Sequence, residues 1–164
     1  MKKLRLVAVL SLVVLASIVM AGCGKRTEVN FVVGLNVQGL SIHHSHLPLN
    51  LIVRSLDELD DFVEGSKYFG GFDEGRFMEL SYVFNRYDAE YFIEKLLIIC
   101  LVSYSDTGWE TEVERVSKKG DKLYVECISS NDGGGFTVLT VGAIVLEIQK
   151  EDVNGMKKVR VSFR

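Results

Sequence analysis

Leu96-Leu97-Ile98-Ile99-Cys100-Leu101-Val102 is an unbroken run of seven apolar residues. The run is too short to cross a bilayer, which takes about twenty apolar residues, and its many branched side chains favour strand over helix. A strand with one face in water alternates apolar and polar residues, so the unbroken run indicates burial on both faces. We therefore expect a central strand that is covered by a sheet on one side and by helix or loops on the other.

The start of the chain has the pattern of a lipoprotein signal peptide. Three cations, Lys2, Lys3 and Arg5, precede an apolar core of fourteen residues, and small residues typical of a processing site follow. Met20-Ala21-Gly22-Cys23 resembles the bacterial lipobox, in which the cysteine is diacylated and becomes the new N-terminus. We expect residues 1–22 to be cleaved and residues 23–29 to form a tether, with a lipid on Cys23 anchoring the protein at the extracytoplasmic face of the cell membrane. The alternative is a plain secretory cleavage site followed by a chance cysteine.

The mature chain is predicted to be acidic. The full chain of 164 residues carries 19 cations and 22 acids, and residues 1–22 hold three cations and no acids, which leaves 16 cations, 22 acids and a formal charge of −6. Nucleic acids bind basic surfaces, so we expect no nucleic-acid partner. An acidic body is also mildly repelled by an anionic membrane, so the lipid on Cys23 is expected to hold the protein there.

Alternating apolar residues and turn signals predict the remaining strands. The central strand is expected to form a three-stranded meander with residues 110–117 and 122–129, through turns at Asp106-Thr107-Gly108 and Lys119-Gly120-Asp121. Further strands are expected at residues 30–40, 51–53 and 136–150, with a short one near residues 77–84. In a last strand, Val159, Val161 and Phe163 are predicted to face inward.

Two short helices are also predicted. Ser55-Leu56-Asp57-Glu58 has the spacing of a capping box, so a helix of about ten residues is expected to begin here and to end at Gly65. Asp88 is expected to cap a second helix with Phe92 and Leu96 on one face, leading into the central strand. The predicted fold class is α+β: one small domain over residues 30–164, mostly antiparallel sheet with two short helices.

Cys100 and Cys127 both fall in strand patterns. A disulfide between them would persist outside the cytoplasm, but strands that flank a third strand hold two cysteines too far apart unless they meet across a closed sheet. Two buried free thiols are the favoured interpretation.

Four segments resemble the PrcB C-terminal-like domain, a small module of bacterial secreted proteins and lipoproteins that is named for a subunit of a surface protease complex. They are residues Val53–Phe62, Tyr87–Phe92, Gly120–Val125 and Ile144–Lys150, and the resemblance covers roughly residues 51–150. It implies an extracytoplasmic accessory or binding module, associated with a surface protease, that has no known catalytic residues.

Three motifs suggest chemistry but also have simpler interpretations. In His43-His44-Ser45-His46, the residues His44 and His46 would chelate zinc or copper if another ligand came from elsewhere, although a solvated loop is favoured. Asp106-Thr107-Gly108 is the tripeptide of aspartic proteases, which need two such aspartates, but it is also a good hairpin turn. Asp132-Gly133-Gly134-Gly135 precedes a strand, whereas a phosphate cradle leads into a helix, so a flexible loop is favoured. No serine or cysteine lies in a nucleophile setting, so we expect no enzyme and no cofactor.

The aromatic residues indicate a binding surface. Nine of the sixteen fall between Tyr68 and Phe92, and of these Phe84 and Phe92 are expected in the core. Others are predicted either to contact an extracytoplasmic protein or peptide or to pack beneath a loop. The predicted contact residues are Tyr68, Phe69, Phe72 and Phe77.

The expected function is that of a non-enzymatic cell-surface lipoprotein that binds a protein or peptide. Inhibition of an extracytoplasmic protease, by insertion of the loop at residues 131–136 into its active site, is an alternative. Metal binding at His43–His46 is a second alternative.

Overall fold

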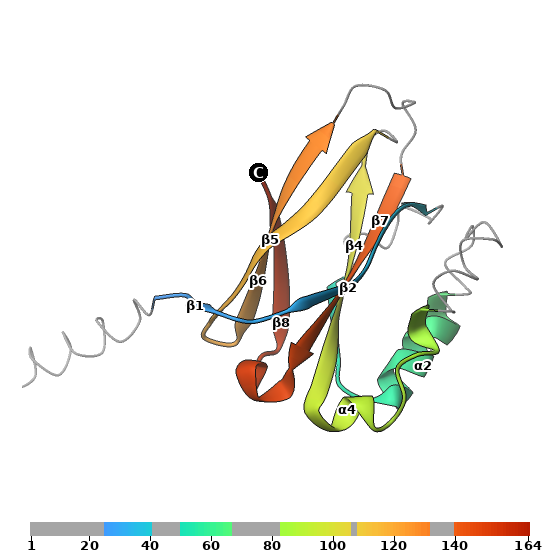
Figure 1. Cartoon of the computed structure of the whole chain (residues 1–164), viewed down its shortest axis with the longest axis vertical. Coiled ribbons are helices and arrows are strands. Elements are labelled where there is room, and N and C mark those ends of the chain that lie inside the picture. Colours follow the sequence, from blue (N-terminus) through green and yellow to red (C-terminus); the bar gives the residue numbers. More distant parts are fainter. Residues whose placement is uncertain (1–24, 41–49, 67–82, 106–107, 132–139) are drawn as a thin grey trace, which may run out of the picture.

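The computed structural model describes residues 25–40, 50–66, 83–105, 108–131 and 140–164. In these residues eight strands form two four-stranded sheets, with sheet A in the order β1-β5-β6-β8 and sheet B in the order β2-β7-β4-β3 (Figure 1). All neighbouring strands are antiparallel except the parallel pair β6 and β8. The predicted α+β fold, mostly antiparallel with two short helices, is confirmed.

The strands are β1 (Thr27–Glu28), β2 (Val32–Leu40), β3 (Asn50–Val53), β4 (Lys95–Tyr104), β5 (Trp109–Lys119), β6 (Lys122–Asn131), β7 (Thr140–Gln149) and β8 (Lys158–Phe163). The helices are α2 (Leu56–Ser66) and α4 (Tyr91–Glu94), and a 3-10 turn, η2 (Lys150–Val153), follows β7.

Strand β4 is the central strand that the apolar run predicts. It pairs with β7 along its whole length and with β3 on its other side. Its side chains alternate between two cores: Ile98 and Cys100 point towards sheet A, whereas Leu97 and Ile99 point towards the helices. The expectation that a sheet covers one face and helices cover the other is therefore confirmed, as the three layers in Figure 1 show.

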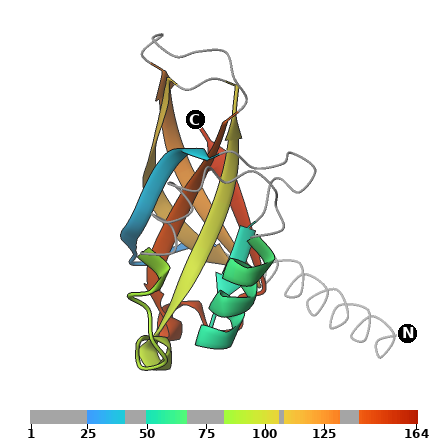
Figure 2. The same cartoon turned by 90° about the vertical axis from the view of Figure 1, so that its right-hand side faces the viewer.

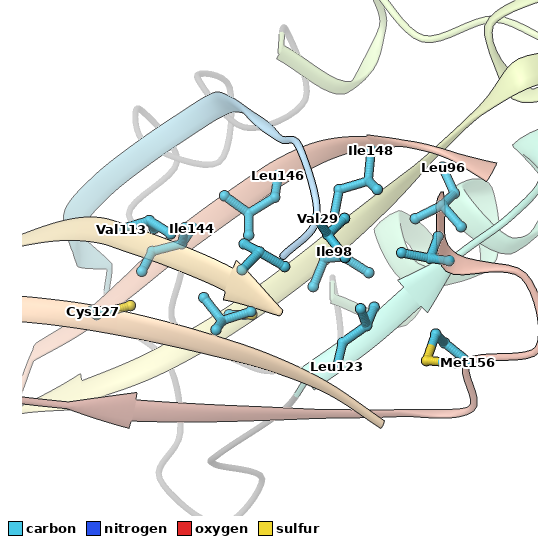
Figure 3. Packing of buried hydrophobic residues seen from close by; sticks show 14 of the residues in the cluster. Val29, Leu96, Ile98, Val113, Leu123, Cys127, Ile144, Leu146, Ile148 and Met156 are labelled. Carbon is cyan, nitrogen blue, oxygen red and sulfur yellow. The ribbon is translucent and has the colours of Figure 1, made fainter. Parts of the chain in front are cut away.

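The inter-sheet core lies between sheets A and B (Figure 3). Fully burying one such aliphatic side chain stabilises the fold by about 1.5–3 kcal/mol, so these contacts are the main force that holds the two sheets together. The core includes Leu96, Ile98, Cys100, Val116, Leu123, Val125, Cys127, Ile144, Leu146 and Ile148.

The helix-side core lies on the opposite face of sheet B, beneath α2 and α4 (Figure 2). Helix α2 begins with the predicted capping box, because Ser55 Oγ accepts a hydrogen bond from the Glu58 amide at 3.2 Å. The Glu58 carboxylate accepts one from the Arg54 amide at 2.7 Å, one residue before the expected partner. The cap fixes the direction of α2, and Leu59 then packs into the core with 1% of its surface exposed.

Several local predictions about the helix side are wrong. Helix α2 continues through Gly65 to Ser66, because the backbone of Gly65 stays out of the left-handed conformation that ends helices. Val83 and Phe84 are helical and not strand, whereas residues 77–82 lie outside the described residues. Phe92 packs in the helix-side core, but Leu96 belongs to β4 and points into the inter-sheet core. Asp88 does bind the start of the helix, since its Oδ1 accepts a hydrogen bond from the Tyr91 amide at 2.8 Å, but Glu90 and not Asp88 occupies the N-cap position of α4.

Of the predicted meander, the pairing of β5 with β6 is confirmed and the pairing of β4 with β5 is wrong. After Tyr104 the chain crosses from sheet B to sheet A, where β5 pairs with β6 and β1 and not with β4. The reason is that β4 is buried on both faces, whereas β5 exposes the side chains of Glu110 and Glu112 and needs one face in water. In β8, Val159 and Val161 pack against the inter-sheet core as predicted, but Phe163 is 42% exposed.

The two ends of the sandwich differ. The connection at residues 41–49 finishes at Asn50, which pairs with Cys100 in the middle of β4. It starts, and the connections at residues 106–107 and 132–139 both start and finish, at one end, here called the loop end, because the strand ends there pair with one another. These pairs are Leu40 with Val141, Tyr104 with Thr140 and Trp109 with Asn131. The opposite end, here called the turn end, holds the tight β5–β6 turn at Gly120, whose φ is 62°, together with η2 and α4.

Replacing Ile98 by alanine tests the assignment of β4 as the central strand. Ile98 is fully buried, so Ile98→Ala is expected to lower the free energy of unfolding by about 2–5 kcal/mol. The matched control is Ile128→Ala, because Ile128 lies on β6 with 45% of its surface exposed and is expected to change stability by less than about 0.5 kcal/mol. Chemical denaturation measures both, and equal losses would contradict the assignment.

Candidate functional site: the exposed face of sheet A

The outer face of sheet A is open to solvent, whereas both faces of sheet B are covered. On β6 the side chains of Leu123, Val125 and Cys127 are buried in the inter-sheet core. The residues between them point the other way, because successive side chains of a strand alternate between its faces. The outer face is therefore a broad surface on which the described strands present polar and charged side chains.

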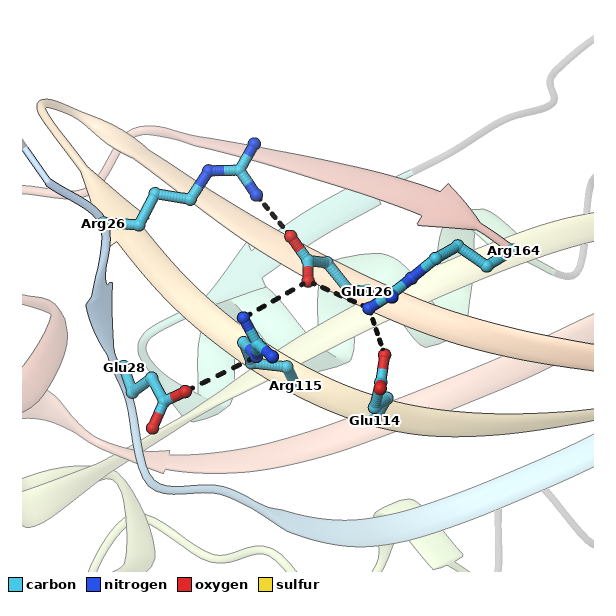
Figure 4. Close-up of polar contacts among 6 residues, drawn as sticks. All are labelled: Arg26, Glu28, Glu114, Arg115, Glu126 and Arg164. Atoms are coloured by element: carbon cyan, nitrogen blue, oxygen red, sulfur yellow. Dashed lines mark hydrogen bonds and ion pairs between the residues drawn. The ribbon is translucent and has the colours of Figure 1, made fainter.

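A network of ion pairs, here called the Glu126 cluster, occupies the middle of this face (Figure 4). The Glu126 carboxylate pairs with Arg26, with Arg164 at 3.6 Å and with Arg115 at 4.0 Å. Arg115 also pairs with Glu28 at 3.4 Å. The network thereby fastens the segment before β1 and the residue after β8 to the central pair of strands.

A bulge in β5 makes the network possible. The pairing of β5 with β6 shifts register between Val113 and Arg115, so that Glu114 and Arg115 are both exposed next to Glu126. Arg164 takes up the Glu114 carboxylate as a second partner. Cations and acids are balanced in this cluster, and it is therefore close to neutral.

The turn end of the same face is basic. Lys119 pairs in register with Lys122, and Lys122 pairs with Lys158, so that three ammonium groups stand in one row across three strands. Arg160 lies in the next row, opposite Tyr124. These four cations, Lys119, Lys122, Lys158 and Arg160, are here called the basic end.

The arrangement of cations in the basic end lowers the stability of the sheet. Like charges directly opposite each other on a sheet destabilise it by up to about 1 kcal/mol per pair. None of the four cations forms an ion pair with another described residue. Towards the loop end, β5 instead exposes Glu110 and Glu112. The face is therefore polarised from basic at the turn end, through a neutral centre, to acidic at the loop end.

A second polar group, here called the Glu147 cluster, lies on the helix side of sheet B. The Tyr87 hydroxyl donates to Glu147 Oε1 at 2.9 Å, and Arg86 Nη2 donates to the same oxygen at 3.1 Å and to the Gly34 carbonyl at 2.9 Å. Burial raises the pKa of Tyr87 to about 12, and burial together with the Glu147 charge raises the pKa of Tyr91. Both phenols thus stay protonated at neutral pH, and the cluster joins β2 and β7 to the segment before α4.

Gly34 leaves room for the side chains of this cluster. A Cβ atom at position 34 would lie 2.6 Å from the Tyr87 hydroxyl and 2.9 Å from the Arg86 guanidinium, both closer than real Cβ contacts. The glycine lies at a shift in the pairing of β2 with β7. It therefore allows the edge strand to approach the cluster, whereas the sequence alone marks it only as a weak point of the strand.

The two thiols lie in the inter-sheet core, Cys100 from sheet B and Cys127 from sheet A, and both are free and buried. Burial raises the pKa of Cys100 to about 12 and that of Cys127 to about 11. At neutral pH both are therefore protonated and behave as small apolar side chains, as the favoured interpretation of the sequence expects.

Most residues that the sequence singles out for function lie outside the described residues. These are Cys23, His43, His44, His46, Tyr68, Phe69, Phe72, Phe77, Asp106 and the run Asp132-Gly133-Gly134-Gly135. Phe84 and Phe92 are buried, as predicted. Sequence reasoning missed the basic end, whose lysines flank two turns, because the parallel pairing of β6 with β8 that aligns them cannot be read from local patterns.

Within the described ranges, no set of three or more His, Cys, Asp or Glu side chains is arranged to hold a metal ion, and no helix there is long and apolar enough to span a membrane. No family model, curated protein or solved structure matches the chain. The resemblance to the PrcB C-terminal-like domain therefore stays a prediction.

Replacing Gly34 by alanine tests the packing of the Glu147 cluster. Gly34→Ala is expected to lower the free energy of unfolding by about 1–3 kcal/mol, because the new methyl group displaces Tyr87 or Arg86. Gly65→Ala is the matched control, since nothing lies within 4 Å of its Cβ position and alanine favours helix there, so stability is expected to stay equal or to rise by up to about 1 kcal/mol. Thermal unfolding measures both, and a harmless Gly34→Ala would show that the cluster is looser than described.

Alkaline titration tests the burial of the thiols. The ordinary pKa of 9.0 is raised to about 12 for Cys100 and about 11 for Cys127 in the folded protein. Because both folded pKa values are raised, the stability from the neutral thiols is complete below pH 9.0 and is lost as the pH rises through these values. Denaturation at stepped pH is expected to show a slope that is shallower in Cys127→Ala, by up to about 1.4 kcal/mol per pH unit. Identical slopes would mean that Cys127 is accessible to water.

Proposed function

We propose that the chain is a non-enzymatic lipoprotein that a lipid on Cys23 holds at the extracytoplasmic face of the cell membrane, where its folded domain binds a protein or peptide. The anchor is supported by the lipobox-like residues Met20-Ala21-Gly22-Cys23 and by where the folded part begins. Arg26 is already held by Glu126 in sheet A. Two residues separate Cys23 from Arg26, so the lipid would lie within about 10 Å of the domain surface.

The observation that carries the binding role is that the connections at residues 106–107 and 132–139 both have their two flanks at the loop end. Each begins and ends on a long strand whose neighbour fixes it, as Trp109 with Asn131 and Tyr104 with Thr140 illustrate. Binding residues are found disproportionately on loops that a rigid scaffold positions. The sandwich supplies such a scaffold, and all of its sheet faces other than the outer face of sheet A are packed.

We place the main contact with the partner in residues 65–85, through Tyr68, Phe69, Phe72 and Phe77. Support comes from the two flanks of this segment, which the core holds next to each other. Phe62 of α2 packs edge to face against Phe84, with ring centroids 5.8 Å apart. The segment thus leaves and rejoins the domain at neighbouring points, which is the geometry of an inserted contact loop.

Inhibition of an extracytoplasmic protease is the second candidate. The connection after Asn131 would be the inserted segment, because both of its ends are fixed. Asn131 at its start pairs with Trp109 of β5, and Thr140 at its end pairs with Tyr104 of β4. Fixed ends lower the entropy that a loop loses on binding. The resemblance to the PrcB C-terminal-like domain agrees with association with a surface protease, whereas metal binding by His43–His46 stays a prediction.

Labelling and cross-linking in cells that produce the protein test the proposal. The chain is expected to incorporate a palmitate analogue, and Cys23→Ser is expected to abolish the label, because the thiol is the acceptor. Cross-linking on intact cells is expected to capture one protein that Phe69→Ser with Phe72→Ser loses and that Ile128→Ser, on the exposed face of β6, retains.

Undiminished labelling of Cys23→Ser would contradict the anchor. Capture of the same protein by all variants would contradict the aromatic contact, and its loss on replacing residues 131–136 by a glycine-serine stretch would favour the protease inhibitor.

A further inference from the structure

We propose that the basic end of sheet A docks on anionic phospholipid headgroups of the membrane that holds the lipid on Cys23. The domain then stands with its turn end at the bilayer and its loop end directed away from it. This inference rests on the proposed lipid anchor and adds the orientation of the domain and a second, electrostatic membrane contact.

The direction of the four cations supports a common docking surface. On β6 and β8 the neighbours of the basic residues, Leu123 and Val159, point into the inter-sheet core, so Lys122, Lys158 and Arg160 point out of sheet A. The start of β8 is held in place, because the amides of Lys157 and Lys158 donate to the Asp121 carbonyl at 2.8 and 3.3 Å. The cations therefore project from fixed positions at the turn end of one sheet face, which suits an extended anionic surface.

The charge balance at the turn end also favours an anionic surface. The acids of this end are Asp121 in the turn, Glu94 in α4, and Glu151 and Asp152 in η2, and Glu126 is already paired with three arginines. The cations of this end outnumber these acids, and they include Lys118, Lys119, Lys122, Lys157, Lys158 and Arg160. A formal charge of −6 for the predicted mature chain would suggest repulsion from the membrane, but the negative charge is not spread evenly. The headgroups lie within a Debye length of about 8–10 Å of the turn end, whereas the acidic loop end is roughly 30 Å away along the strands.

The segment predicted as a tether, residues 23–29, leads to the same place, and its second half is part of the fold, since Thr27 and Glu28 form β1 and Val29 is buried in the inter-sheet core. Arg26 lies with its guanidinium 4.0 Å from the centre of the Tyr124 ring, and Tyr124 pairs in register with Arg160 of the basic end. Cys23 is three residues before Arg26, so the bilayer that holds its lipid must lie within about 10 Å of this corner of sheet A. Anchors that combine acyl chains with a basic patch bind membranes more stably than either alone.

Vesicle binding by the chain from Lys25 to Arg164 tests the inference. This chain retains every residue of the inter-sheet and helix-side cores, and its fold is checked by circular dichroism. It is expected to sediment with phosphatidylglycerol vesicles at about 50 mM salt, to be released at about 500 mM salt, and to ignore phosphatidylcholine vesicles. Lys122→Gln with Lys158→Gln is expected to weaken binding about tenfold, since each cation near an anionic surface contributes several-fold.

The matched control is Ser130→Glu with Ile128→Glu, which changes the net charge by the same amount on exposed residues of β6 nearer the loop end of the same sheet. Binding by the control is expected to stay within about twofold of the parent chain. Equal loss in both double variants, or equal binding to both kinds of vesicle, overturns the proposal. If Lys122→Gln with Lys158→Gln keeps its vesicle binding but loses an acidic protein that the parent chain cross-links on intact cells, the basic end binds a protein, and the proposal is overturned.

The tested chain carries no lipid, so its binding to vesicles does not depend on acylation. Failure of the proposed anchor would appear in the palmitate label, and failure of the basic end would appear in vesicle binding.

The melting temperature gives an independent check. Removing Lys122 and Lys158 is expected to leave it unchanged or raise it, since the substitution relieves the repulsion in the row.

Discussion

Burial of β4 on both faces is the constraint on which the rest of the structure depends. A strand whose side chains are all apolar must have a cover on each side, and here sheet A supplies one and the helices supply the other. The three layers follow from this requirement. Sheet A is left with a single buried face, and its outer face is free to carry charges that are arranged for reasons other than packing.

Local chemistry in the sequence is sufficient to identify most of the elements. The apolar run at residues 96–102, the capping box that begins at Ser55, and the glycine turn at Gly120 each act over a few residues, and the structure bears all of them out. Pairing between distant segments is different. The crossing from β4 to β5 and the parallel pairing of β6 with β8 depend on which apolar faces meet in three dimensions, and turn signals carry no information about that.

In the candidate site, too, the residue types can be read from the sequence, whereas their arrangement depends on pairing between distant segments. The lysines are visible in the sequence, but Lys122 and Lys158 are 36 positions apart and become neighbours only through the β6–β8 register. Gly34 is similar, because its need for a hydrogen side chain comes from Arg86 and Tyr87 far along the chain. Net charge also proved a coarse guide: an acidic total conceals a face that changes sign along its length, and a membrane or a partner meets only one part of it.

The proposed orientation is defined by which end of the domain faces the bilayer, and the distance of each end from the lipid measures it directly. A fluorophore placed at Asp121→Cys in the β5–β6 turn, and another at Ser130→Cys near the far end of β6, would be read by energy transfer to a dye in anionic vesicles that hold the full acylated chain. The turn position is predicted to lie close to the bilayer and the other about 25 Å further away, as the length of the strand requires. Equal distances, or a shorter distance from position 130, would contradict the orientation and the role that the basic end is given.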